Sequence, residues 1–221
     1  MTVQESRLDL ERRRRLGMVE AVWGEHKSVD QIVAILQAMQ TAGELALVTR
    51  VDEEKAAAIQ GRCSAVQVHS QAACLTLGEI PVIGRAAQVA VLSGGTSDRR
   101  VSEEASLALR VHGVATEPFL DVGVAGLHRL LDVLPDLAPM SVLIACAGME
   151  GALPTVLAGL VPQPVIGVPV SVGYGVSAGG RAALDGMLAS CAPGLSVVNI
   201  DNGYGAAMAA LRILKGAAFQ D

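Results

Sequence analysis

The sequence is poor in aromatic residues and has no long apolar run. Its 221 residues include one Trp, two Tyr and two Phe. Proteins that hold nucleic acids stack bases on aromatic rings and present positive charge to the phosphates. With so few rings and a formal net charge of −5, a nucleic-acid partner is not expected. No apolar stretch reaches about 18 residues without a Gly, Pro or polar break, so no membrane span is expected either.

Paired cysteines are also missing. Cys63, Cys74, Cys146 and Cys191 form no CxxC motif, which argues against a zinc ribbon. The opening segment "MTVQESRLDLERRRRLG" lacks the apolar stretch of a secretory signal. We therefore expect a cytoplasmic protein whose cysteines are free thiols.

The sequence is instead rich in Ala, Val, Leu and Gly. Hydrophobic residues make up 51% of the chain, and 24 residues are Gly. Over residues 89–221, apolar runs that end in Gly-rich turns alternate with helical segments. This alternation predicts an α/β domain with a doubly wound, mostly parallel sheet. Ligands of such sheets bind beyond the carboxyl ends of the strands.

The N-terminal part has a different composition. Residues 1–60 are rich in charge and are predicted to form a mostly helical extension, with Ser28 as the N-cap of one helix. The arginine run Arg12–Arg15 is either a solvated helix face or a grip for an anion. No single structure is predicted for the connecting region 61–88.

The turn "SGGTSD", residues 93–98, follows a predicted strand and opens a helix. Free amides at a helix start, together with the helix dipole, favour a bound anion. A phosphate site is one interpretation, and N-capping by Ser97 or Asp98 is the other. The motif is neither GxGxxG nor a P-loop.

Carboxylates follow several predicted strands. Glu150, in "CAGMEG", is either a partner of the helix dipole or a general base. Asp98, Asp121 and Asp201 either shape turns or present oxygens to Mg²⁺. His128, inside the helix predicted over 124–135, is interpreted as a surface or core residue.

Cys191 raises a separate question, because it stands at the end of a predicted helix, before "APG". The negative end of a helix dipole disfavours a thiolate. From this position alone, an inert cysteine is the simpler interpretation.

The turns together resemble the LarB family of nickel-pincer nucleotide cofactor synthesis. The matching segments are "VLSGGTSD", "DVGVAGLHRLL", "CAGMEGALPTVLAGLVPQPVIGVPVSVGYG" and "SCAPGLSVVNIDNGYGAA", and the N-terminal "LDLERRRRLGMVEAVWGEHKSVDQI" resembles that family's leader. The fold implied is flavodoxin-like, similar to N5-carboxyaminoimidazole ribonucleotide mutase. Where the purine enzymes have a "SAHR"-type segment with a catalytic His, this chain has "DVGVAG".

The resemblance implies a reaction and a set of site residues. The reaction is carboxylation of nicotinic acid adenine dinucleotide by CO2 or bicarbonate, with hydrolysis of its pyrophosphate to release AMP. Cys191 is implied as the nucleophile and Glu150 as the acid–base group, with Mg²⁺ held by Asp98 and Asp121. The implied substrate-binding residues are Ser93, Gly94, Gly95, Thr96, Ser97, Asp98, Asp121, Gly148 and Asn202. The resemblance also implies a homo-octamer.

The chemistry gives the cysteine a reason to be present. A pyridinium ring is electron-poor and does not attack CO2, but a thiolate added at C4 converts it into a nucleophilic enamine. The cationic ring would favour the thiolate beside it. Two alternatives stay open: a purine-type carboxylase or mutase, which needs no cysteine, and a non-catalytic nucleotide-binding module.

Overall fold

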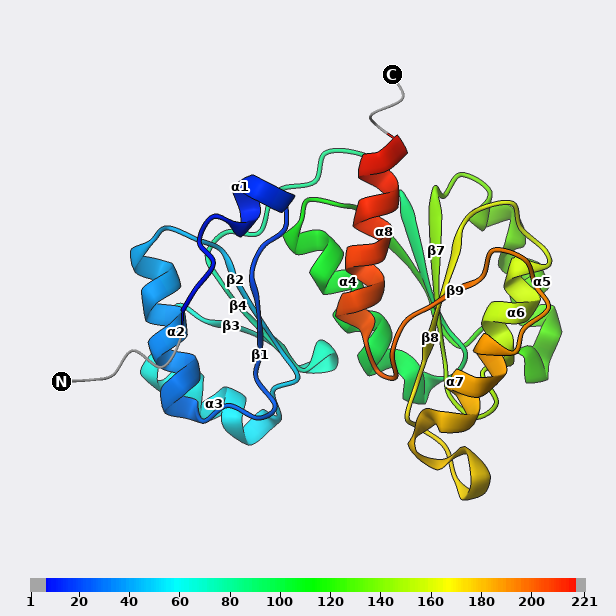
Figure 1. Ribbon diagram of the computed structural model, residues 1–221, viewed down its shortest axis with the longest axis horizontal. Helices are drawn as coiled ribbons and strands as arrows, with labels where there is room; N and C mark the ends of the chain where they lie inside the picture. Colours follow the sequence, from blue (N-terminus) through cyan, green and yellow to red (C-terminus); the bar gives the residue numbers. More distant parts are fainter. Residues whose placement is uncertain (1–6, 218–221) are drawn as a thin grey trace. The chain divides into compact units, whose positions relative to one another are not determined.

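The computed structural model describes residues 7–217, which fold into two units (Figure 1). The boundary falls after Val82, and residues 111–113 group with the first unit. Each unit has its own sheet, one of four strands and one of five.

The first unit contains a mixed sheet with the strand order β1-β2-β4-β3. β1 and β2 are parallel, whereas β4 runs antiparallel to both β2 and β3. Its elements are α1 (Arg12–Leu16), β1 (Ala21–Trp23), α2 (Val29–Thr41), β2 (Ala46–Thr49), α3 (Glu53–Arg62), β3 (Gln67–His69), η1 (Ser70–Ala72) and β4 (Cys74–Leu77). Ile32, Leu36 and Met39 of α2 pack against Val48 and Leu75 of the sheet to form the core of this unit.

The expected mostly helical extension over residues 1–60 therefore differs from the structure in two ways. The segment contributes two strands to a sheet, and that sheet continues to Leu77 through the region for which no structure was predicted. Strands of three or four residues are too short to show a clear alternation of apolar and polar side chains. The predicted N-cap is present: the Ser28 hydroxyl accepts from the Gln31 amide, and the Gln31 side chain accepts from the Ser28 amide.

The second unit confirms the predicted α/β class. Its five strands are all parallel, in the order β6-β5-β7-β8-β9. Its elements are β5 (Val89–Ser93), η2 (Thr96–Asp98), α4 (Arg99–Val111), β6 (Thr116–Phe119), η3 (Val124–Gly126), α5 (Leu127–Leu137), β7 (Val142–Ala147), α6 (Ala152–Ala158), β8 (Val165–Pro169), η4 (Gly175–Gly180), α7 (Arg181–Leu188), β9 (Ser196–Val197) and α8 (Gly203–Ala217). This is the flavodoxin-like order, in which the chain reverses its direction of winding between β5 and β7.

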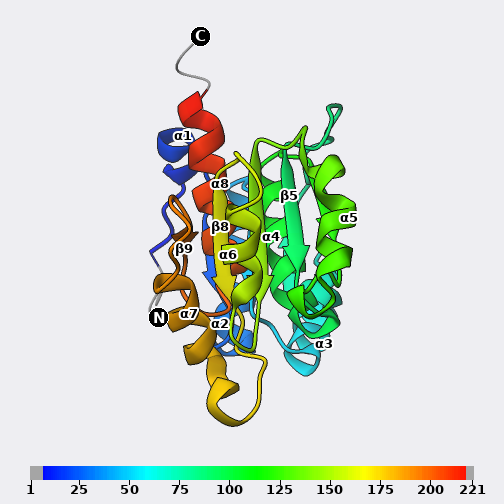
Figure 2. The same cartoon turned by 90° about the vertical axis from the view of Figure 1, so that its right-hand side faces the viewer.

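Helices cover both faces of this sheet, α4 and α8 on one side and α5, α6 and α7 on the other (Figures 1 and 2). The central strands β5, β7 and β8 are buried at every position, as expected for parallel strands covered on both faces. The edge strands are short or interrupted: β6 includes Pro118, and β9 has two residues. None of the helices in residues 7–217 is long and apolar enough to cross a bilayer.

Candidate active site

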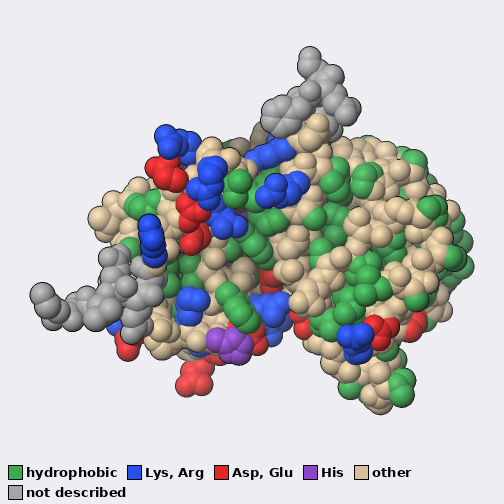
Figure 3. Space-filling model, in the orientation of Figure 1, with side chains coloured by type: hydrophobic (Ala, Val, Ile, Leu, Met, Phe, Trp, Pro, Cys, Tyr) green, Lys and Arg blue, Asp and Glu red, His purple; other side chains and the backbone are tan. Residues whose placement is uncertain are grey.

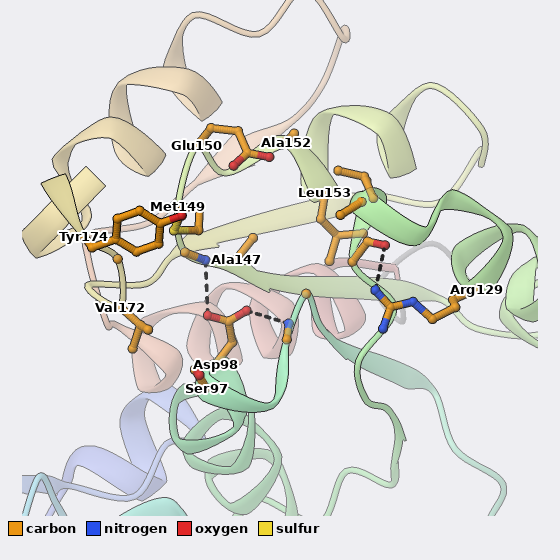
Figure 4. Close-up of a pocket in the computed structure, with 17 residues that line it drawn as sticks. Ser97, Asp98, Arg129, Ala147, Met149, Glu150, Ala152, Leu153, Val172 and Tyr174 are labelled. Carbon is orange, nitrogen blue, oxygen red and sulfur yellow. Dashed lines mark hydrogen bonds between the residues drawn. The ribbon is translucent and has the colours of Figure 1, made fainter. Parts of the chain in front are cut away.

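A pocket of about 450 Å³ lies at the carboxyl ends of four strands of the second unit. It is lined by the turns after β5, β6, β7 and β8, which places it at the switch point between β5 and β7. Its size is in the usual range for a site that binds a small molecule or part of a cofactor. The lining residues are Gly94, Gly95, Ser97, Asp98, Gly123, Val124, Ala125, Arg129, Ala147, Gly148, Met149, Glu150, Ala152, Leu153, Val172, Gly173 and Tyr174 (Figure 4).

The turns after β7 and β8 pack backbone against backbone at Gly148. The Met149 amide donates to the Val172 carbonyl at 3.2 Å. A Cβ at position 148 would lie 2.3 Å from that carbonyl oxygen, so only glycine fits here. Met149 itself has a φ of +54°, which is unusual for a residue with a long side chain. Backbone of this kind is held by its surroundings and is frequent at ligand sites.

Asp98 ties the turn after β5 to the turn after β7. Its side chain is 5% exposed, and its two oxygens accept from the Gly95 amide at 2.8 Å and the Gly148 amide at 3.2 Å (Figure 4). Burial raises the pKa of Asp98; the two amides oppose this shift, and the charge of Asp201 adds to it. The Gly95 amide, one of the donors expected for a phosphate, is therefore directed at Asp98.

Glu150 lies on the pocket wall with an exposed side chain, on the opposite side from Asp98 in the close-up view (Figure 4). Its backbone is in contact with α7, where a Cβ at Gly186 would lie 2.5 Å from the Glu150 carbonyl oxygen. The position fits a group that exchanges protons with a bound ligand and with solvent.

Cys191 is not among the residues that line this pocket. It follows α7 by three residues and is the only exposed one of the four cysteines. Cys146, at the end of β7, is buried, and that burial, with the nearby charge of Asp98, raises the pKa of its thiol. Of the two cysteines on this domain, Cys191 is thus the one with access to a reagent or a second molecule.

The other predicted substrate-binding residues divide into two groups. Gly94, Gly95, Ser97, Asp98 and Gly148 line the pocket, whereas Ser93, Thr96, Asp121 and Asn202 do not. The Ser93 hydroxyl is fully buried and accepts from the Asp121 amide at 3.3 Å. The Asn202 side chain accepts from the Gly205 amide at 2.8 Å at the start of α8. These two side chains organise turns, which residue type and spacing do not distinguish from ligand binding.

Arg129 is the charged residue of the pocket lining that the sequence prediction missed. It belongs to the first turn of α5, and its guanidinium forms an ion pair with Asp121, Nη1 to Oδ2 at 2.6 Å. A helical pattern alone does not show that this side chain reaches a pocket. A usable signal was its distance of only six residues from the glycine-containing turn that ends at Gly123.

The described residues do not build a magnesium site on their own. Among residues 7–217, no three His, Cys, Asp or Glu side chains are close enough together to hold a metal ion. Of the two expected ligands, Asp98 accepts from two amides and Asp121 pairs with Arg129. These donors do not fit a metal ion held by the protein alone.

Comparison with known proteins agrees with this architecture. Residues 1–79 match the family model of the LarB/PurE-like N-terminal domain, and residues 88–219 match that of AIR carboxylase. An uncharacterised protein of Methanocaldococcus jannaschii is 38% identical over 220 residues, which cover 95% of this chain and 84% of that protein.

A second relative matches the C-terminal part. The N5-carboxyaminoimidazole ribonucleotide mutase of the same organism is 36% identical over 133 residues, 57% of this chain and 78% of the mutase. The pocket at the switch point therefore lies in the domain that matches AIR carboxylase. The four-stranded sheet of the first unit lies in the domain that matches the LarB/PurE-like N-terminal model. The chain belongs to the AIR carboxylase family and carries the N-terminal domain of its LarB/PurE-like members.

Proposed function

We propose that the protein carboxylates the pyridinium ring of nicotinic acid adenine dinucleotide and hydrolyses its pyrophosphate, releasing AMP. Family membership supports a carboxylase-type activity. The observation that carries the finer proposal is the turn after β6. This turn contributes Gly123, Val124 and Ala125 to the pocket, and no imidazole is among the described lining residues. This lining favours the proposed reaction over a purine-type reaction that uses a histidine on this turn.

The proposed carboxylation proceeds through a covalent adduct. The Cys191 thiolate forms a C–S bond at ring C4, and the ring electrons move to give a dihydropyridine whose C5 is nucleophilic. C5 forms a C–C bond to CO2. Loss of the C5 proton to a base, followed by departure of the thiolate, restores the aromatic ring. Sulfur is neither oxidised nor reduced, and these reaction steps together release one proton per CO2 fixed.

Glu150 is the acid–base group of this proposal. It is the exposed carboxylate on the pocket wall, whereas Asp98 is buried and accepts from two backbone amides. An exposed carboxylate can accept the C5 proton and pass it to water, which a carboxylate enclosed by amides does less readily.

Cys191 must meet the ring although it does not line the pocket of its own chain. We propose that a second copy of the chain supplies it within the expected homo-octamer. Exposed apolar side chains of the second unit, including Tyr174, Val176 and Leu188, support burial between copies. In Figure 3, hydrophobic and uncharged atoms dominate the visible face of this unit.

One assay tests the proposal against its two rivals. The protein is incubated with nicotinic acid adenine dinucleotide, bicarbonate and Mg²⁺, and AMP and the carboxylated ring are followed by mass spectrometry. We expect both products from the wild type and neither carboxylated product nor adduct from Cys191→Ser. Carboxylation of aminoimidazole ribonucleotide instead would establish the purine reading. Dinucleotide binding without turnover, unchanged in Cys191→Ser, would establish a binding module.

A further inference from the structure

We infer that the Arg129 guanidinium binds an oxyanion of the ligand. Without ligand the guanidinium is paired with the Asp121 carboxylate, and the ligand oxyanion displaces this carboxylate on binding. The inference deepens the proposed function and rests on it for the identity of the ligand. It concerns two residues for which the sequence predicted no such pairing.

The first observation is the charge inside the pocket. Arg129 is the only basic residue among the described residues that line it, and the two acidic ones are Asp98 and Glu150. A dinucleotide with phosphates and a ring carboxylate is repelled by both acids. A cation is needed to hold such a ligand, and Arg129 is the cation that this lining offers.

The second observation is the position of the guanidinium. It lies over the turn before α5, where a Cβ at Gly126 would be 2.7 Å from Arg129 Nε. Since position 126 has no side chain, the Arg129 side chain can lie along the turn and reach the pocket. Its Nη2 donates to the Gly123 carbonyl at 3.5 Å (Figure 4). A hydrogen bond of this length is weak, so a ligand oxyanion can compete for this donor.

The third observation is that the pair with Asp121 is open to exchange. The Arg129 and Asp121 side chains are 36% and 51% exposed. Water competes for both groups at this exposure, so the pair contributes little net free energy. The guanidinium fork matches a carboxylate or a phosphate in two-point geometry. A ligand oxyanion, held by further contacts in the pocket, can therefore take the place of Asp121.

The inference predicts opposite effects for the two partners. Affinities of the full-length protein are measured by titration calorimetry without bicarbonate. The probes are nicotinic acid adenine dinucleotide, nicotinamide adenine dinucleotide and AMP. We expect Arg129→Gln to weaken binding of the acid dinucleotide by about 10- to 100-fold, the usual cost of losing a hydrogen bond to a charged group. Asp121→Asn should tighten it several-fold, because it removes the competing charge. Arg62→Gln, which breaks the exposed pair with Asp30 in the first unit, is the matched control and should change nothing.

The three probes separate the two sources of the oxyanion. If Arg129 binds the ring carboxylate, Arg129→Gln weakens the acid dinucleotide but neither the amide dinucleotide nor AMP. If it binds phosphate, all of the probes that occupy that subsite weaken together. Wild-type affinity in a folded Arg129→Gln protein would overturn the inference, as would unchanged affinity in Asp121→Asn. Tight binding in these titrations, with no carboxylated product in the separate assay that contains bicarbonate, would refute the proposed function and leave the inference standing.

Discussion

The Asp98 carboxylate and the Gly148 amide, fifty positions apart in the chain, meet at 3.2 Å across the switch point of the sheet. Through this contact and the one to Gly95, a single buried side chain fixes two of the turns that form the pocket. Asp98 therefore holds the turns of the site in place, although its position in the "SGGTSD" motif suggested a ligand-binding residue.

Replacing Asp98 by Asn should destabilise the fold. The amide group of Asn can accept from only one of the two backbone amides and turns a donor towards the other. We expect a loss of about 1–3 kcal/mol, the usual cost of leaving a buried polar group unsatisfied. Chemical unfolding monitored by circular dichroism measures it. Asp132→Asn, at an exposed position on α5, is the control and should stay within about 0.5 kcal/mol of the wild type.

The same pair of proteins tests the pH dependence of stability. The folded-state pKa of Asp98 is raised by burial, so the folded protein retains this proton to higher pH than the unfolded chain does. The resulting stabilisation is complete below the unfolded pKa of about 3.9 and is lost as pH rises through the folded pKa. The stability difference between wild type and Asp98→Asn should shrink from pH 4 to pH 7. A difference that grows over this interval would show that the folded pKa is lowered instead.

Thiol reactivity should separate Cys191 from the other cysteines. Cys63, Cys74 and Cys146 are buried, and only Cys191 is exposed. Brief treatment with iodoacetamide should add one group per native chain, identified at Cys191 by peptide mapping, and four per unfolded chain. If Cys191 lies at a neighbour's pocket in the assembly, bound nicotinic acid adenine dinucleotide should cover the thiol and slow this labelling. Labelling at Cys146 in the native state would contradict the burial described for β7.

Mixing two inactive variants should restore activity if Cys191 acts on a neighbour's pocket. Cys191→Ser retains Glu150, and Glu150→Gln retains the thiol. A mixed assembly therefore contains some sites with both groups intact. We expect formation of the carboxylated ring to recover to roughly a quarter of the wild-type rate at equal mixing, by random assortment. No recovery after subunit exchange, verified by native mass spectrometry, would place both groups in one chain.

The contact between α7 and the turn after β7 can be tested with a matched pair of glycines. A Cβ at Gly186 would be 2.5 Å from the Glu150 carbonyl, whereas one at Gly61 in α3 meets nothing within 4 Å. Alanine in a helix gains about 0.5–1 kcal/mol over glycine, and overpacking costs about 1–3 kcal/mol. Gly61→Ala should therefore raise the melting temperature and Gly186→Ala should lower it. A stabilised Gly186→Ala protein would show that α7 can move away from the Glu150 carbonyl without a loss in the free energy of unfolding.

The strongly periodic part of the fold could be predicted from the sequence, and the short elements could not. An apolar run such as Val142–Ala147 predicts a central strand, and in the structure this strand is buried at every position. β1 and β3 have three residues each, and their strand character comes from pairing with neighbours. β9 is likewise short, since only Ser196 and Val197 pair with β8.

The site was predictable to a similar degree. Glycines and polar residues after strands identified the turns, and the parallel sheet brings those turns together, as at Gly95 and Gly148. The partners of each side chain depend on distances between turns that no spacing in the sequence reports. The Asp98 contacts and the Arg129–Asp121 pair are of this kind.

The edges of the five-stranded sheet restrict how copies of this domain can associate. Pro118 removes a hydrogen-bond donor from β6, and β9 offers only two residues, so neither edge is a good template for adding another strand. Continuous sheets across subunits are thereby disfavoured. Contacts between copies would then rest on helix faces and connecting turns, and the segment that carries Cys191 is one of those turns.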